Sequence, residues 1–177
     1  MYERYTVPAR RAVFFAVWYA RLEETQAVDS VHLLKGLMYQ EDFRANTIFS
    51  LREHFPLYSS YPCKFATGQE VPKRPPVLTN DAKSAVYWTA LEADALRDYW
   101  INTEHMLLGI LAVPGCPAAQ YLAKTGLTQK DARRLVMENK ASQPDYGPVP
   151  RLWKVQSSVE HWILRWPMRI RRLRQRV

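Results

Sequence analysis

Glycine and cysteine are scarce in this chain, and each scarcity excludes a class of function. Six glycines in 177 residues leave little material for a glycine-rich phosphate loop, and the pattern Gly-x-x-x-x-Gly-Lys-Ser/Thr is absent. Two cysteines, Cys63 and Cys116, are too few for a disulfide framework and have no metal-binding spacing. We therefore expect no ATP hydrolysis, no metal, no cofactor and a reducing compartment.

Long apolar runs are also missing, and none reaches the length of a membrane span. The opening residues, Met-Tyr-Glu-Arg-Tyr-Thr, lack the basic-then-apolar order of a signal peptide. We expect a cytoplasmic protein. Because 47% of the residues are hydrophobic and 12% are aromatic, we expect the chain to fold around a core of its own.

The positive charge is concentrated at one end. Residues 151–177 hold eight Arg or Lys against the single acid Glu160, so they carry seven of the eight net positive charges. The rest of the chain is nearly neutral. Any attraction to nucleic acid, to anionic lipid or to an acidic protein is therefore expected from this basic tail.

An internal repeat organises the remainder. Residues 6–38 align without a gap on residues 79–111, at an offset of 73. The eight identical pairs are Thr6/Thr79, Ala9/Ala82, Ala12/Ala85, Val13/Val86, Ala20/Ala93, His32/His105, Leu34/Leu107 and Gly36/Gly109. About two matches are expected by chance from average composition, so the chain contains two copies of one unit.

The spacing of apolar residues predicts helices in each copy. A first helix follows Thr6 or Thr79 as N-cap, and a second follows Ser30 or Thr103 as N-cap. Residues 43–52 and 117–124 predict a short third helix, and a fourth begins at Thr128 in the second copy only. The proline-rich segment from Phe55 to Phe65 predicts an ordered irregular stretch, and no alternation predicts a sheet.

Two motifs resemble a known family. Tyr2-Glu-Arg-Tyr-Thr6 followed by Ala9-Arg-Arg resembles the opening of Clp N-terminal domains. Asn102-Thr-Glu-His-Met-Leu-Leu-Gly-Ile110 resembles their repeated Gly-Thr-Glu-His-Ile-Leu-Leu-Gly-Leu motif, and 29–37 is a degenerate first copy. The resemblance implies an all-helical domain of two pseudo-symmetric repeats with up to four helices each, which docks adaptors and captures substrates for AAA+ unfoldases.

The resemblance also implies a ligand site. Some Clp N-terminal domains recognise phosphorylated arginine through the Thr that begins each first helix and the Glu of the Thr-Glu-His motif. Thr79 and Glu104 match these positions, whereas in the first copy Thr6 remains but Val31 replaces the Glu. Helix N–H groups suit an anion and a carboxylate suits a guanidinium. The simpler interpretation, which we favour, is that Thr79 and Glu104 only cap and charge helix N-termini.

Other candidate sites have structural explanations. His32 and His105 lie beside leucines and have no second ligand at i+3 or i+4, so we expect buried, hydrogen-bonded structural histidines. Ser, His and Asp residues occur without a nucleophile-elbow motif or paired catalytic acids, so we expect no enzyme and no small-molecule substrate.

The tail interleaves tryptophans with arginines, and three interpretations remain open beside the simplest one, a solvated or partly disordered end. It lies on an anionic membrane, binds nucleic acid, or packs against its own domain or a partner. Tryptophan is costly to leave in water, which favours packing of the first part and exposure of the arginine-rich end. The expected polyanion-binding residues are Arg165, Arg169, Arg171, Arg172, Arg174 and Arg176.

We therefore predict a double-repeat domain at 1–142, with repeat 1 at about 1–61, a linker at about 62–77 and repeat 2 at about 78–142. A proline-rich linker at 143–150 and the basic tail at 151–177 follow. The predicted function is a non-catalytic adaptor, modulator or substrate-recruiting accessory that binds a Clp ATPase, a Clp protease subunit, an adaptor or a substrate protein. The alternative is a nucleic-acid- or membrane-associated protein that reuses the fold.

Overall fold

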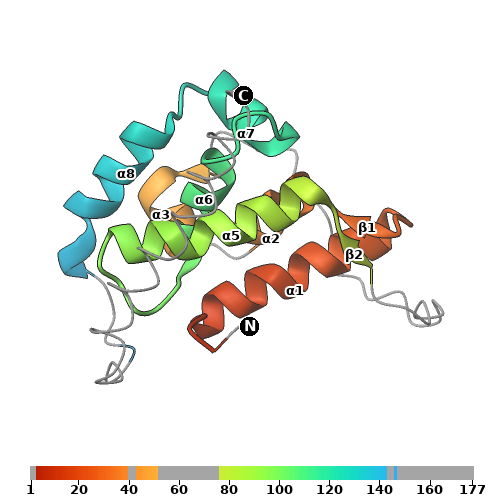
Figure 1. Ribbon diagram of the computed structural model, residues 1–177, viewed down its shortest axis with the longest axis horizontal. Coiled ribbons are helices and arrows are strands. Elements are labelled where there is room, and N and C mark those ends of the chain that lie inside the picture. The colour runs from red at the N-terminus through yellow and green to blue at the C-terminus, as the bar shows by residue number, and fades with distance from the viewer. Residues whose placement is uncertain (1–2, 40–42, 52–75, 143–145, 147–177) are drawn as a thin grey trace, which may run out of the picture. The chain divides into compact units, whose positions relative to one another are not determined.

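A computed structural model describes residues 3–39, 43–51, 76–142 and 146 (Figure 1). The chain divides into two units, Met1–Pro144 and Asp145–Val177. The first unit contains every helix and strand given below. The segment from Phe55 to Phe65 and the basic tail lie outside the described residues.

The first unit is helical and follows the predicted repeat. The first copy contains α1 (Val7–Leu22), α2 (Ser30–Met38) and α3 (Arg44–Phe49). The second copy contains α5 (Asn80–Ala95), α6 (Thr103–Leu111), α7 (Pro117–Lys124) and α8 (Gln129–Glu138), followed by a 3-10 turn at Lys140–Ser142. The predicted all-α fold class is confirmed.

Each first helix packs closely against its second helix because the contact is lined by small residues. Ala9, Ala12, Ala16 and Ala20 of α1 are fully buried. A Cβ atom placed on Gly36 of α2 would lie 2.2 Å from the carbonyl oxygen of Ala12. The alanines and the glycine therefore allow the two backbones to approach at a distance that no larger residue permits.

Backbone pairing joins the two copies, and it does so twice in the same way. Strand β1 (Ala27–Val28) pairs in parallel with β2 (Val77–Leu78), and Tyr5 forms a parallel bridge with Ile101. Val28 and Ile101 are equivalent in the repeat, as are Tyr5 and Leu78. The prediction of no sheet is therefore wrong, because pairs this short leave no alternation for the sequence to display.

The second helices begin one residue earlier than predicted. Asp29 and Asn102 are the N-caps of α2 and α6, so Ser30 and Thr103 are the first helical residues and not the caps. The N–H of Asn102 donates to Nδ1 of His105 at 3.0 Å, and the N–H of Asp29 donates to Nδ1 of His32 at 3.2 Å. The third helical residue thus completes a capping box with histidine in the place usually taken by Glu or Gln.

Ser30 and Thr103 accept hydrogen bonds from the third helix of the other copy, and they do so at equivalent positions. The N–H of Ala45 in α3 donates to Oγ1 of Thr103 at 3.1 Å, and the N–H of Ala118 in α7 donates to Oγ of Ser30 at 3.4 Å. Each hydroxyl therefore satisfies a free N–H at the start of the other copy's third helix. Both residues are fully buried, so these contacts tie the copies into one core.

Candidate functional site

A buried polar network lies where the start of α1 meets the start of α6. The hydroxyl of Thr6 donates to Oδ1 of Asn102 at 3.0 Å, and the N–H of Thr6 donates to the carbonyl of Ile101 at 2.9 Å. The side-chain amide of Asn102 reaches Oε1 of Glu104 at 3.5 Å. Thr6, Asn102 and Glu104 are all buried, so this junction holds polar groups that must find partners inside the protein.

Arg44 supplies the main partner of Glu104. Its Nε donates to Oε1 of Glu104 at 2.8 Å, and its other nitrogens donate to the carbonyls of Asn139 and Ser142 at 3.1 and 2.9 Å. One guanidinium thus joins the start of α3, the start of α6 and the end of α8. The second carboxylate oxygen of Glu104, Oε2, is buried and has no hydrogen-bond partner.

His105 extends the network towards Lys140. Its Nε2 lies 3.2 Å from Oδ2 of Asp98, and Nζ of Lys140 lies 2.9 Å from Oδ1 of the same carboxylate. Burial alone would raise the pKa of Asp98, but the contacts with His105 and Lys140 outweigh it and hold that pKa below its usual value. Because Nδ1 of His105 accepts a backbone N–H, Nε2 carries the proton that faces Asp98.

The repeat-related junction, where the start of α5 meets the start of α2, surrounds Thr79. Its N–H donates to the carbonyl of Val28 at 3.0 Å. Its hydroxyl, which has a single proton, lies within hydrogen-bond distance of both that carbonyl, at 3.2 Å, and the carboxylate of Asp81. Asp81 accepts the N–H of Ser30 at 3.1 Å. Burial would raise the pKa of Asp81, but hydrogen bonds from Thr79 and Ser30 lower it below its usual value. A carboxylate therefore already occupies the N-terminus of α2.

These junctions occur in a fold that is shared with known proteins. No protein-family model matches the chain. The N-terminal domain of the Clp protease-associated chaperone ClpD from Arabidopsis thaliana superposes with a TM-score of 0.58 at 18% identity, covering 80% of this chain and 97% of that domain. The chain has the fold of a Clp N-terminal domain.

Two further Clp N-domains agree with this assignment. The Hsp104 N-terminal domain from Candida albicans gives a TM-score of 0.55 at 14% identity, over 80% of this chain and 94% of that one. The ClpV1 N-terminal domain from E. coli gives 0.54 at 18% identity, over 83% and 91%. The similarity spans almost the whole of each Clp N-domain, so both repeats are included.

The Clp N-domain fold distributes the predicted site residues over both junctions. Thr6 and Glu104 belong to one buried network, joined through Asn102. Thr79 lies at the other junction, where it contacts Val28 and Asp81. Thr6 and Thr79 do cap their helices as predicted, each accepting the N–H three residues on. The six predicted tail arginines lie outside the described residues.

Two members of the first junction were missed from sequence. Asn102 had a signal, because it aligns with Asp29 and both are good N-cap residues, but the Ser or Thr that follows each of them is a good N-cap residue too. Arg44 had no sequence signal, because it lies 60 residues before Glu104 and its counterpart in the second copy is Pro117. The counterpart of Glu104 is Val31, so the ion pair that joins the two copies at this junction corresponds to two uncharged residues, Pro117 and Val31, at the other junction.

Groups suited to other chemistry are few in the described residues. Within these residues no cluster of three or more His, Cys, Asp or Glu side chains is placed to hold a metal ion. The predicted structural role of the histidines is confirmed, because His32 and His105 are both buried and both complete capping boxes. No described helix is long and apolar enough to cross a membrane.

Proposed function

We propose that this chain is a non-catalytic protein-binding module that acts in the cytoplasm as an adaptor, modulator or substrate-recruiting accessory of Clp-type protein quality control. The observation that carries the proposal is the match to 97% of the ClpD N-terminal domain, a domain of a protein named as a protease-associated chaperone. The partner is a Clp ATPase, a Clp protease subunit, an adaptor or a client protein.

Co-purification from cells tests this function. The full-length chain carries an affinity tag, and quantitative mass spectrometry compares it with a variant whose six tail arginines are changed to Gln. We expect Clp ATPases, Clp protease subunits or their clients to be enriched by both proteins, because the proposal assigns binding to the repeats. Enrichment that vanishes with the tail arginines would assign the interaction to the tail instead.

We further propose that Thr6, Thr79 and Glu104 mark ligand contacts for a peptide or for phosphoarginine. The buried Oε2 of Glu104 has no hydrogen-bond partner inside the protein, so a ligand guanidinium that opens the junction would satisfy it. The start of α1, in the same network, or of α5, at the other junction, suits the phosphate. Arg44 competes for the same carboxylate. A phosphoarginine peptide should therefore bind, and Glu104→Gln should weaken its affinity.

The capping interpretation predicts a different result. If these residues serve only the fold, Glu104→Gln lowers thermal stability while a phosphoarginine peptide has no measurable affinity for either protein. Isothermal titration with phosphorylated and unphosphorylated forms of one peptide separates the two outcomes. Phosphate alone is the further control, because binding through the anion only would not depend on Glu104.

The second candidate function is association with a polyanion or an anionic membrane. Seven net positive charges within residues 151–177 support it, because such a segment displaces condensed counterions from a nucleic acid and gathers at an anionic bilayer.

A further inference from the structure

The outer faces of α1 and α5 carry the same exposed pattern. Arg10 and Phe14 of α1 are equivalent in the repeat to Lys83 and Tyr87 of α5. All four are exposed, with 57% of Phe14 and 42% of Tyr87 accessible to solvent. In each copy the cation precedes the aromatic residue by four positions, so the two lie on one face of the helix. The repeat thus presents a cation and an aromatic ring twice.

A second aromatic ring supports each exposed one. Phe14 and Phe15 lie edge to face with centroids 5.5 Å apart and planes at 73°, and Tyr87 and Trp88 do the same at 6.0 Å and 74°. We call Arg10, Phe14 and Phe15 the Phe14 station, and Lys83, Tyr87 and Trp88 the Tyr87 station. Edge-to-face contacts hold the exposed rings, so they lose little conformational freedom when a partner binds.

Neither station is neutralised by a carboxylate of its own helix. Helix α1 contains no acidic residue between Val7 and Leu22. The three acids of α5 are engaged elsewhere: Asp81 accepts the N–H of Ser30, Glu92 pairs with Arg133, and Asp94 pairs with Arg4. Within the described residues neither Arg10 nor Lys83 has an ion-pair partner, so both positive charges can pair with an external carboxylate.

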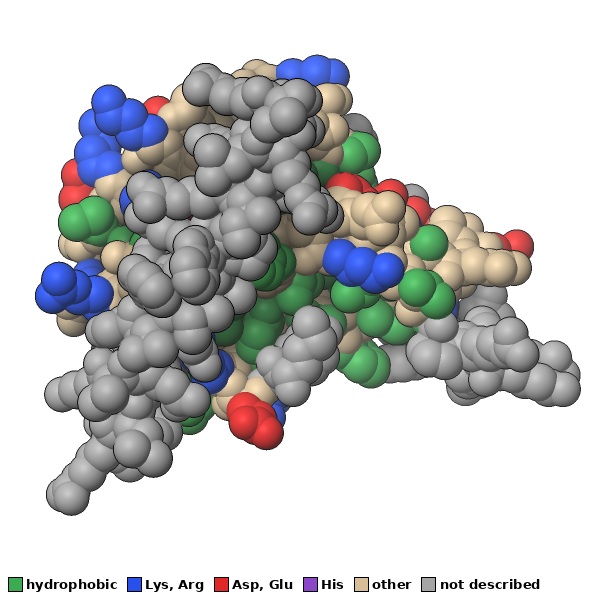
Figure 2. Space-filling view, viewed as in Figure 1, with side chains coloured by type: hydrophobic (Ala, Val, Ile, Leu, Met, Phe, Trp, Pro, Cys, Tyr) green, Lys and Arg blue, Asp and Glu red, His purple; other side chains and the backbone are tan. Residues whose placement is uncertain are grey.

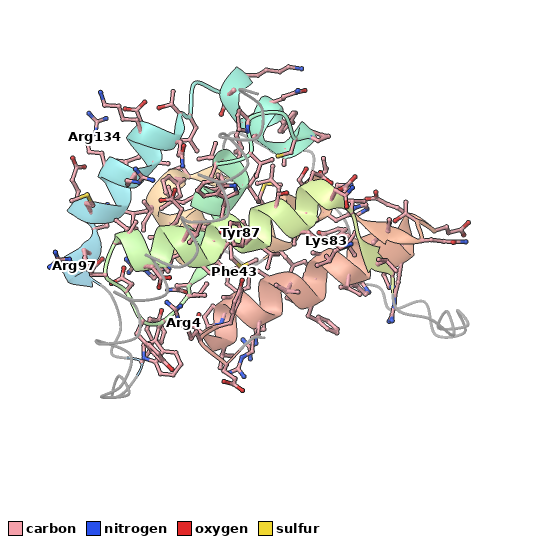
Figure 3. All side chains as sticks on the ribbon, viewed as in Figure 1. Arg4, Phe43, Lys83, Tyr87, Arg97 and Arg134 are labelled. Carbon is pink, nitrogen blue, oxygen red and sulfur yellow. The ribbon has the colours of Figure 1, made fainter. Side chains whose placement is uncertain are left out.

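Apolar side chains flank the Phe14 station. Figure 2 shows hydrophobic side chains gathered along α1 on the viewed face, and Val7 of this helix is 52% exposed. Figure 3 labels Lys83 and Tyr87 along α5. Exposed aromatic side chains beside cations are typical of protein interfaces, where aromatic residues and Arg are enriched.

We propose that each station is a docking site for an acidic amphipathic segment of a partner protein. The apolar side chains of the segment cover Phe14 or Tyr87, and its carboxylates pair with Arg10 or Lys83. This inference rests on the proposed protein-binding function and specifies its surface. A single-stranded nucleic acid is the competing occupant, because its bases would stack on the rings and its phosphates would pair with the cations. The exposed Val7, which lies on the same face of α1 as Phe14, favours a protein segment with apolar side chains.

A pair of synthetic peptides tests the surface on the full-length chain. Both form amphipathic helices with the same leucine face, and one carries Glu where the other carries Lys. We expect fluorescence anisotropy to show tighter binding of the Glu peptide. Phe14→Ala with Tyr87→Ala should weaken it by about tenfold or more, and Arg10→Glu with Lys83→Glu should reverse the preference in favour of the Lys peptide.

Helix α8 provides matched controls. Met137 is 60% exposed and Lys130 is exposed, so Met137→Ala with Lys130→Glu removes an exposed apolar side chain and reverses a charge outside the stations. This variant should leave both affinities unchanged. The basic tail is present in every protein compared, so any attraction it exerts on the Glu peptide is constant.

Several results would overturn the proposal. They are the absence of binding, equal binding of the two peptides, a preference that survives charge reversal at Arg10 and Lys83, and tighter station-dependent binding of a single-stranded oligonucleotide. If the peptides fail while Clp partners still co-purify with the station variants, the docking surface is rejected and the proposed function stands.

Discussion

At the scale of single residues, Gly36 and Gly109 show how closely the two copies share their packing. A Cβ on Gly36 would lie 2.2 Å from the oxygen of Ala12, and one on Gly109 would lie 2.3 Å from Oγ1 of Thr89 and 2.5 Å from the oxygen of Ala85. Ala12 and Ala85 are equivalent in the repeat. The position of each glycine was predictable from sequence because the repeat keeps it together with the alanines that it contacts.

We expect Gly36→Ala to lower the free energy of unfolding by about 1–3 kcal/mol or more, because the added methyl group meets backbone atoms that must shift. Chemical denaturation measures the change. Gly115→Ala is the matched control, since no atom lies within 4 Å of a Cβ placed there. Equal stability of the Gly36→Ala and Gly115→Ala proteins would contradict the close contact of α1 with α2.

Glu104 is fully buried and bonded to Arg44. Glu104→Val copies the residue at the equivalent position of the first repeat, but it leaves the charge of Arg44 without its carboxylate. We expect a loss of about 3–5 kcal/mol in unfolding free energy, as is typical when one partner of a buried ion pair is removed.

The surface substitution Arg134→Gln provides the comparison. Arg134 is 66% exposed and pairs with Asp131 and Glu138, so its loss should cost less than about 1 kcal/mol. A Glu104→Val protein as stable as the Arg134→Gln protein would show that the buried pair contributes little net stability.

At the scale of elements, the sequence predicted the first helices best and the junctions least. Thr6 and Thr79 are preferred N-cap residues, and the alanines that follow them at helical spacing indicate α1 and α5. The strands at Ala27–Val28 and Val77–Leu78 are only two residues long and pair across about 50 positions of sequence, so no local pattern reveals them. The ion pair of Arg44 with Glu104 was unpredictable for the same reason, because only folding brings α3 to the start of α6.

Asp98, which contacts the capping-box residue His105 of α6, should make stability depend on pH. The pKa of Asp98 is lowered in the folded protein, so ionised Asp98 stabilises the fold above its unfolded-state pKa of about 4. That stabilisation is lost as pH falls through the lower folded-state pKa. We therefore expect unfolding free energy to decline below about pH 4, with a shallower decline for Asp98→Asn.

Thermal unfolding, followed by circular dichroism at a series of pH values above and below about 4, measures this decline in stability. Glu138→Gln serves as a control because its side chain is 59% exposed and its loss should leave the acid dependence unchanged. An identical acid slope for the wild-type and Asp98→Asn proteins would remove Asp98 from the explanation.

At the scale of the whole molecule, charge and fold are separate properties. The fold match covers about 80% of the chain, whereas seven of the eight net positive charges lie in residues 151–177. We expect the full-length chain to bind single-stranded DNA, RNA or anionic vesicles with an affinity that falls steeply with salt. Changing the six tail arginines to Gln should abolish this binding and leave the helical signal intact. Absence of binding at low salt would reject the polyanion function.

The central claim, a protein-binding module of Clp-type quality control, is tested most directly in a reconstituted degradation assay. A purified Clp ATPase, its protease and a fluorescent client from the same organism are mixed with increasing amounts of the full-length chain, and the loss of client fluorescence is followed. An adaptor, modulator or recruiting accessory should change the degradation rate in a saturable way, and Gly109→Val should abolish the effect by disrupting the repeat. An unchanged rate at every concentration, with no binding to the ATPase, the protease or the client, would contradict the claim.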